Sequence, residues 1–156
     1  MKSFFRILVV VLGLLICTNS LHAQWVQTNG PYGEKIFCLA TDGTNLFAGS
    51  YFGVFLSTNS GANWTPVNTG LPSDNVYSLA VSGTKVFAGT SSSGVFLSTN
   101  NGTSWTAAGL TDYYVNALAG CGTNLIAGAD FFWKGDFRWF YVFLSTNNGT
   151  SWTTVN

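Results

Sequence analysis

A unit of about forty residues occurs three times in this chain, and the repetition constrains the fold more than any other feature. The three units span residues 36–75, 76–114 and 115–156. Repeats of this length stack copies of one supersecondary unit, because a single unit cannot bury its hydrophobic face alone. We therefore expect residues 24–156 to form one array of stacked units.

Each unit contains four short runs of strand-forming residues, separated by clusters of Gly, Asn and Ser. In the first unit these runs are residues 36–40, 45–48, 54–58 and 64–67. Such runs, bounded by turn residues, are typical of β-strands, which we label A to D in chain order. Four repeated strands predict the blades of a β-propeller better than a three-sheet sandwich. The expected fold is all-β, a partial β-propeller of three four-stranded antiparallel blades.

The connection between strands C and D reads STNSGANW, STNNGTSW and STNNGTSW in the three units. A short polar side chain can hydrogen-bond the loop backbone, glycine permits a positive φ, and tryptophan anchors the turn in the blade core. We expect structural roles at these positions. They are Ser57, Asn59, Gly61, Trp64, Ser98, Asn100, Gly102, Trp105, Ser145, Asn147, Gly149 and Trp152.

This connection resembles the Asp-box, or BNR repeat, of sialidases, sortilin-type receptors and photosystem assembly factors, usually written Ser-x-Asp-x-Gly-x-Thr-Trp. Asn59, Asn100 and Asn147 replace the aspartate. An amide oxygen can accept the same hydrogen bonds, so the structural role remains while a role that needs negative charge does not. The resemblance covers residues 36–152. It implies a propeller fold whose Asp-box loops lie away from the catalytic face, and it implies no activity.

Residues 1–23 are predicted to be a helical signal peptide. Two basic residues precede an apolar run from Ile7 to Ile16, and polar residues follow up to Ala23. A run of ten apolar residues is about half of what a membrane-spanning helix needs. We expect cleavage near Ala23 and a secreted, periplasmic or cell-surface protein with no stable membrane span. A lipoprotein signal at Cys17 is a less favoured alternative.

Cleavage would remove the only histidine and leave four basic residues against six acidic ones, a net charge of −2. A chain without surplus positive charge is not expected to bind nucleic acid. A histidine-dependent catalytic triad is excluded, no metal site or cofactor is expected, and Arg138 alone cannot form the three-arginine clamp of sialidases. Cys38 and Cys121 occupy different repeat positions, so unpaired thiols are favoured over a disulfide.

Residues 24–30 resemble residues 63–70 at the end of the first unit, which predicts a lone N-terminal fourth strand. In many propellers such a strand completes the last blade. Propellers generally have four or more blades, whereas this chain has three. We therefore expect the remaining blades of a larger ring, or self-association, to cover its open sheet faces.

Turns alternate between the two ends of an up-and-down blade, so the B–C and D–A connections share one end. Five of the six acidic residues fall there, where loops over a rigid scaffold commonly bind ligands. The third B–C connection is enlarged and could turn a hairpin that presents aromatic rings to a sugar or peptide, although packing on a neighbouring blade is favoured. The candidate ligand residues are Glu34, Asp74, Asp112, Asp130, Trp133, Asp136, Arg138, Trp139 and Tyr141.

These features favour a non-catalytic binding or scaffolding module for a protein or glycan ligand. One alternative is a fragment of an exported glycoside hydrolase, which would use two carboxyl groups roughly 5 to 9.5 Å apart. Another is an assembly factor like that of the photosystem family. No feature of the sequence pairs the acidic residues, so we expect no enzymatic activity.

Overall fold

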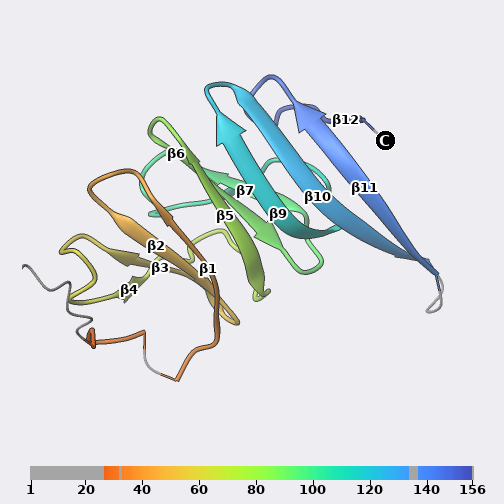
Figure 1. Ribbon diagram of the computed structural model, residues 1–156. Helices are drawn as coiled ribbons and strands as arrows, with labels where there is room; N and C mark the ends of the chain where they lie inside the picture. Colours follow the sequence, from red (N-terminus) through yellow and green to blue (C-terminus); the bar gives the residue numbers. More distant parts are fainter. Residues whose placement is uncertain (1–26, 32, 134–136, 156) are drawn as a thin grey trace, which may run out of the picture.

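The computed structural model describes residues 27–31, 33–133 and 137–155, and this part of the chain consists of twelve β-strands without a helix (Figure 1). Within these residues, no helix has the length and apolar character needed to cross a membrane. The predicted signal peptide, the beginning of the expected lone strand and Asp136 lie outside the described residues.

The strands form three antiparallel sheets, each built from four consecutive strands, which confirms the expected all-β class and strand count. We call the sheets blades one, two and three. Blade one contains β1 (Ile36–Thr41), β2 (Leu46–Ser50), β3 (Gly53–Ser57) and β4 (Thr65–Pro66). Blade two contains β5 (Val76–Ser82), β6 (Lys85–Thr90), β7 (Val95–Ser98) and β8 (Thr106–Ala107). Blade three contains β9 (Tyr114–Cys121), β10 (Asn124–Trp133), β11 (Phe137–Ser145) and β12 (Thr153–Thr154).

The three blades lie side by side in chain order, with blade two in the middle (Figure 1). Strand β5 contacts β1 and β2 of blade one, and β9 contacts β5 and β6 of blade two. The first strands of the blades are therefore neighbours, as expected for the inner strands of a propeller. Blades one and three each have one side turned away from blade two.

Each junction between blades buries the same pair of surfaces. One hydrophobic cluster joins Phe47, Val54 and Leu56 of blade one to blade two, and a second joins Phe87, Val95 and Leu97 of blade two to blade three. We call these residues the forward face of a blade. The backward face, which receives the preceding blade, consists of Leu79, Val86, Ala88 and Phe96 in blade two and of Leu118, Leu125, Ala127 and Phe143 in blade three.

A glycine in the second strand lies against the following blade at each of the two junctions. A Cβ atom on Gly49 would lie 2.9 Å from the carbonyl oxygen of Val76, and one on Gly89 would lie 2.9 Å from that of Val115. These distances are too short for a side chain. A Cβ atom would also meet Cys38 Sγ or Ser78 Oγ of the same blade, so the repeated glycine is required both by its own blade and by the following one.

The two ends of the blades carry different connections. In blade three the backbone N–H of Asn148, in the C–D loop, donates to the carbonyl oxygen of Thr123 in the A–B turn (2.9 Å). In blade two the N–H of Ser91, in the B–C turn, donates to the carbonyl oxygen of Asn75 in the D–A connection (2.9 Å). We call the first end the loop end and the second the connection end.

The described N-terminal residues run beside the C–D loop of blade one. Asn29 forms a parallel bridge with Asn63, and among residues 27–30 this bridge is isolated rather than part of a ladder. Thr28 lies over Gly61, just as Val67 of blade one lies over the corresponding glycine of blade two. The segment therefore occupies the position that the fourth strand of a preceding blade would fill.

Both cysteines of the described chain are free, and their surroundings differ. Burial raises the pKa of the Cys38 thiol to about 11, although a hydrogen bond from the backbone of Gly49 partly opposes this shift. Cys121 is exposed.

We expect iodoacetamide at pH 8 to alkylate Cys121 and to spare Cys38 until the protein is unfolded, because the thiolate is the reactive form. Mass spectrometry of peptides from residues 24–156 would measure the labelling of both cysteines. Equal labelling of the two thiols in the folded protein would contradict this assignment.

Candidate functional site

The three C–D loops have the same hydrogen-bond pattern at the predicted positions. In blade two the N–H of Gly102 donates to Ser98 Oγ (2.8 Å), and that hydroxyl donates to Asn100 Oδ1 (2.9 Å). The same amide oxygen accepts from the N–H of Ser104 (2.9 Å). The loops of blades one and three repeat these three bonds at 2.9 to 3.0 Å.

Two consecutive positive φ angles turn each loop. Ser60, Asn101 and Asn148 have φ between 55° and 57°, and the glycine after each has φ between 79° and 85°. The glycine is needed for this backbone, and a buried serine beneath it satisfies its N–H. In these bonds the serine and asparagine side chains of the motif contact only atoms of their own loop.

The tryptophan of the loop connects one blade to the blade before it. Trp105 Nε1 donates to the carbonyl oxygen of Val67, and Trp152 Nε1 donates to that of Ala108, each at 2.7 Å. The corresponding Trp64 Nε1 is buried and has no hydrogen-bond partner among the described residues. The sequence predicted that each ring anchors the turn in the core of its own blade. In the structure, the rings of Trp105 and Trp152 also bond to the preceding blade.

At the connection end, Asp74 is engaged in structural hydrogen bonds. Its carboxylate accepts from Ser91 Oγ, from the N–H of Ser92 (3.0 Å) and its Oγ (2.8 Å), and from the N–H of Asn75 (2.9 Å). Burial acts to raise the pKa of Asp74, but the hydrogen bonds outweigh burial and hold the pKa below its usual value. Asp74 thus ties the D–A connection to the B–C turn of blade two.

Asp130 lies inside a strand rather than in a connection. It is buried in β10, opposite Tyr114 on one side and Phe140 on the other. The sequence interpretation that placed its carboxylate on an open loop face is therefore wrong. The reason is that β10 and β11 extend into the enlarged segment and remain paired up to Trp133 and Phe137. This pairing agrees with a hairpin that lengthens the two strands.

The remaining candidates are spread along blade three and the neighbouring connections. Tyr141 packs with Tyr113 (5.8 Å between ring centroids) in a cluster at the junction of blades two and three, whereas Trp139 is exposed. Trp133 ends β10, and Arg138 lies near the beginning of β11. Asp112 is exposed, and Glu34 is half-buried. The predicted acidic residues that the structure describes therefore do not form one cluster of three, and Asp136 lies outside the described residues.

An aromatic patch that sequence reasoning missed lies at the connection end, across blades one and two. We define it as Phe37, Tyr51, Phe52 and Tyr77. The ring of Phe37 meets Tyr77 edge-on (4.9 Å between centroids) and lies 5.6 Å from Tyr51, whose ring is 6.0 Å from Phe52. Tyr51 and Phe52 are 49% and 67% exposed, although both rings are large and apolar.

Local irregularities of the strands produce this patch. The register shifts between Ile36 and Cys38 in β1, and the same shift occurs beside Tyr77 in β5. A bulged residue is not paired and its side chain is re-aimed, which explains why Phe37 and Tyr77 meet. The sequence signal was the pair Tyr51 and Phe52, since two aromatic residues fill a turn where Gly, Asn or Ser is usual.

The patch has the chemistry of a contact surface. Lys35 Nζ lies 5.1 Å from the centroid of the Phe37 ring, a cation–π arrangement, and Asn75 Nδ2 donates to the hydroxyl of Tyr77 (3.4 Å).

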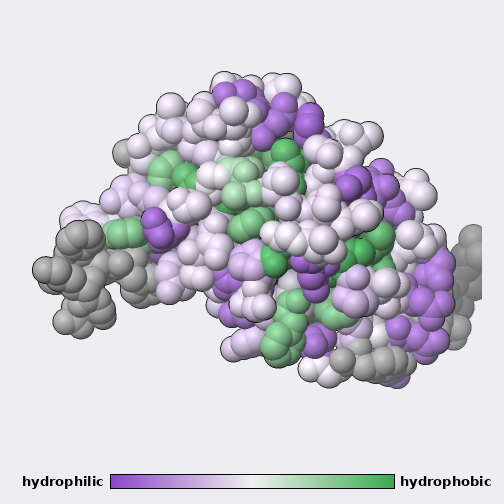
Figure 2. All heavy atoms as spheres, turned by 180° about the vertical axis from the view of Figure 1, so that it is seen from behind, coloured by the Kyte–Doolittle hydropathy of each residue, from purple (hydrophilic) through white to green (hydrophobic). Residues whose placement is uncertain are grey.

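The described residues contain no group of three His, Cys, Asp or Glu side chains that could hold a metal ion. Figure 2 shows apolar side chains gathered in separate patches on one side of the molecule, between polar and neutral residues.

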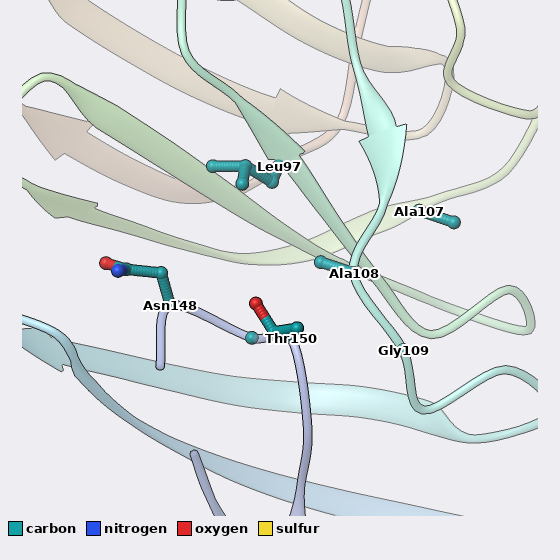
Figure 3. Close-up of a pocket in the computed structure, with 7 residues that line it drawn as sticks. Leu97, Ala107, Ala108, Gly109, Asn148 and Thr150 are labelled. Atoms are coloured by element: carbon teal, nitrogen blue, oxygen red, sulfur yellow. The ribbon is translucent and has the colours of Figure 1, made fainter. Parts of the chain in front are cut away.

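A shallow groove of about 270 Å³ lies between blade two and the C–D loop of blade three (Figure 3). Its lining contains no titratable side chain: Leu97, Ala107, Ala108, Gly109, Asn148, Gly149 and Thr150. A similar groove lies where residues 27–29 meet the C–D loop of blade one. Because the groove recurs where an outer strand meets the next loop, we interpret it as a feature of blade packing.

Comparison with known proteins identifies the fold family. The model of the DUF6242 beta propeller domain matches residues 20–156. A search of curated proteins finds no match.

Several solved propellers are similar in structure. An ancestral GH74 enzyme has a TM-score of 0.65 at 28% identity over 86% of this chain and 20% of its own. YCF48 bound to D1 peptide has a TM-score of 0.67 at 13% identity over 83% of this chain and 41% of its own. The Niastella koreensis GH74 enzyme has a TM-score of 0.60 at 20% identity, covering 74% of this chain and 20% of its own.

The chain thus spans about a fifth of the length of the GH74 enzymes and about two-fifths of YCF48. The similarities at 13% and 20% identity show the fold alone. The expected β-propeller fold is confirmed by the three stacked four-stranded sheets and by the family match. The chain belongs to the DUF6242 β-propeller domain family.

Proposed function

We propose that this chain is a non-catalytic binding or scaffolding module for a protein or glycan ligand, and that the aromatic patch is its contact surface. The observation that carries the proposal is the exposure of Tyr51 and Phe52 at the connection end, with the rings of Phe37 and Tyr77 packed beside them. Aromatic rings on a rigid support provide large contact area at low entropic cost.

The similar propellers support these two classes of ligand. YCF48 was solved bound to a D1 peptide, and one similar GH74 protein is a xyloglucanase. Flat ring faces suit both classes, because they contact the apolar faces of sugars and the side chains of extended peptides. Lys35, next to the Phe37 ring, adds a positive charge at the edge of the patch.

The environments of Asp74 and Asp130 support a non-catalytic role. A glycoside hydrolase needs one carboxyl group whose pKa is raised so that it can donate a proton, with a second carboxylate nearby. Hydrogen bonds shift the pKa of Asp74 in the opposite direction, and its oxygens are already engaged by Ser91 and Ser92. Asp130 is buried within a strand.

Binding of residues 24–156 to glycan and peptide arrays would test the proposal. We expect the double substitution Tyr51→Ser with Phe52→Ser to weaken binding by about tenfold or more, since exposed aromatic anchors dominate such interfaces. Both rings are exposed, so their replacement should leave the fold intact. Thr103→Ala in the C–D loop, at the opposite end, is the matched control.

Trp133→Ala with Trp139→Ala forms the second arm of this experiment. Loss of binding in this arm alone would move the contact surface to the hairpin of blade three. Unchanged binding in both arms would exclude the connection end as the binding surface.

We also propose that the C–D loops are Asp-box, or BNR, motifs in which asparagine replaces aspartate. The supporting observation is that Asn100 Oδ1 accepts two hydrogen bonds that a carboxylate could also accept. We expect Asn100→Asp to change the thermal midpoint little, and Asn100→Leu to cost about 1 to 3 kcal/mol by leaving these donors unsatisfied. Equal midpoints of the two variants in thermal denaturation would argue against this role.

We further propose that the chain acts after export, as a secreted, periplasmic or cell-surface protein. The support is the basic and apolar pattern of residues 1–23. Intact mass measurement of the protein from its native host should give a chain that begins at or near Gln24. A protein whose mass still includes Met1 and the apolar run would disprove cleavage.

A further inference from the structure

The aromatic patch already holds an ammonium group of this chain. Lys35 Nζ lies over the ring of Phe37, 5.1 Å from its centroid. The face of an aromatic ring is negative, so it attracts a cation. Lys35 is itself exposed, so its ammonium can leave the ring for water. The structure therefore contains one example of an exchangeable ammonium group on this surface.

Three further rings lie next to this position at different inclinations. Tyr77 meets Phe37 edge-on at 86°, and Tyr51 is inclined to Phe37 by 38°. Phe52 is inclined to Tyr51 by 50°. Blades one and two, which carry these rings, both belong to the described residues. The rings do not form one continuous flat platform of the kind that a sugar chain would follow, whereas several inclined rings are typical of sites that hold alkylammonium groups.

Hydrogen bonds fix the turn that carries Tyr51 and Phe52. The side chain of Asn68 spans this turn, because its Oδ1 accepts the N–H of Val54 (2.7 Å) and its Nδ2 donates to the carbonyl oxygen of Phe52 (3.0 Å). The N–H of Phe52 donates to Oγ of the buried Ser50 (3.1 Å). Both backbone polar groups of Phe52 are therefore bonded, although its side chain is 67% exposed. A turn held in this way does not have to be ordered when a ligand binds, which lowers the entropic cost of binding.

The charges beside the patch favour a cationic ligand. The connections that flank the patch carry the carboxylates of Glu34 and Asp74 against the ammonium of Lys35. Lys134 and Arg138 belong by sequence to the third B–C connection, on a blade that carries no ring of the patch. Once the Lys35 ammonium has moved aside, the remaining charges attract a cation and repel an anion.

Asp74 keeps its negative charge at neutral pH. Burial acts to raise the pKa of Asp74, but hydrogen bonds from Ser91 and Ser92 outweigh burial and hold the pKa below its usual value. The carboxylate also accepts the backbone N–H of Asn75 (2.9 Å), and the Asn75 side chain donates to the hydroxyl of Tyr77 (3.4 Å). A permanent negative charge is thus linked to a ring of the patch through Asn75.

We infer, resting on the proposed role of the aromatic patch as the contact surface, that its ligand is a lysine side chain of a protein partner. The ammonium of that lysine takes the place of Lys35 on the ring of Phe37. Its methylene chain lies against the exposed rings of Tyr51 and Phe52. A protein lysine is favoured over the amino group of a glycan because the group observed on the ring is the end of a lysine side chain. Lys35 then acts as an internal competitor that occupies the ring while no ligand is bound.

Two matched peptides test the inference by NMR titration of residues 24–156. One is acetyl-Gly-Ser-Gly-Lys-Gly-Ser-Gly-amide. The other carries norleucine in place of the lysine, which keeps the methylene chain without the charge. We expect the lysine peptide to bind about two- to thirtyfold more tightly, the range from an exposed to a desolvated cation–π contact. The signals of Phe37, Tyr51, Phe52 and Tyr77 should shift on binding.

Three variants separate the charge from the apolar contact. Lys35→Gln should bind the lysine peptide at least about threefold more tightly than the wild type does, because the internal competitor and its like charge are gone. Lys85→Gln removes the same charge at the loop end and should bind like the wild type. Phe37→Leu keeps an apolar side chain but removes the ring face, so it should abolish the preference for lysine over norleucine. Circular dichroism checks the fold of each variant, and Lys35 is exposed, so its replacement should leave the fold unchanged.

Equal affinities for the two peptides overturn the inference, and so does a Lys35→Gln variant that binds the lysine peptide no better than the wild type. Absence of binding by both peptides overturns it as well. A glucosamine trimer that binds where the lysine peptide does not would assign the ammonium to a glycan and exclude the protein lysine. Failure of the proposed function has a different signature, because Tyr51→Ser with Phe52→Ser would then leave the binding of every array ligand unchanged.

Discussion

Replacing Trp105 with alanine should lower the free energy of unfolding by about 3 to 5 kcal/mol, the range for removing a buried large aromatic side chain. Trp105 is 3% exposed within the core between blades one and two, and its indole N–H is bonded to the carbonyl oxygen of Val67. The substitution removes apolar area from both blades and leaves that carbonyl oxygen without its donor. Urea denaturation of residues 24–156 would measure the loss.

Trp64→Ala is the matched control for this experiment. Trp64 occupies the same position in blade one, but it is only half-buried, and its indole N–H has no partner among the described residues. Its loss should therefore cost clearly less than the loss of Trp105. Equal costs for the two substitutions would show that the connection to a preceding blade contributes little to stability.

The second large effect is expected for Gly89→Ala, which should destabilise the protein by about 1 to 3 kcal/mol or more, as overpacking of a dense core does. The added methyl group would clash with Ser78 Oγ of the same blade, and it would lie 2.7 Å from Val115 Cγ1 and 2.9 Å from the Val115 carbonyl oxygen of the following blade. Because one of these atoms belongs to the backbone of blade three, relief requires the two blades to separate. Thermal and urea denaturation would both report the change.

Gly128→Ala provides the comparison within the same repeat position. The space beyond Gly128 holds only Ala117 Cβ at 3.6 Å, an ordinary contact distance. The chain should therefore tolerate the methyl group, because Ala117 is smaller than its counterpart Ser78 and no atom of another blade lies near. A loss of stability similar to that of Gly89→Ala would mean that strand propensity, and not contact between blades, makes this position glycine.

The repeat made most of the fold predictable, because strand-forming runs and turn residues act locally. The first predicted strands, residues 36–40 and 45–48, differ from the observed β1 and β2 by at most two residues at either end. The fourth strand was less well predicted: residues 64–67 shorten to Thr65–Pro66, the two residues that pair with β3. The roles of the loop serines and asparagines likewise followed from local hydrogen-bond chemistry.

The candidate site was less predictable, because it depends on contacts between segments that are distant in sequence. Asp74 looked available for a ligand, but Ser91 and Ser92, from the turn of the following blade, surround its carboxylate. Asp130 looked like a loop residue until the pairing of β10 with β11 placed it in a strand. The patch around Phe37 depends on a bulge, which strand periodicity does not reveal.

The bonds from Trp105 to Val67 and from Trp152 to Ala108 both point toward the N-terminus, which gives assembly of the array a direction. As the chain leaves the ribosome or a translocation pore, each acceptor carbonyl emerges about forty residues before its donor. A completed blade is thus the template on which the next one closes, without waiting for any later segment. Folding by sequential addition suits a nearest-neighbour array, and it leaves only the forward face of the last completed blade waiting for the next one.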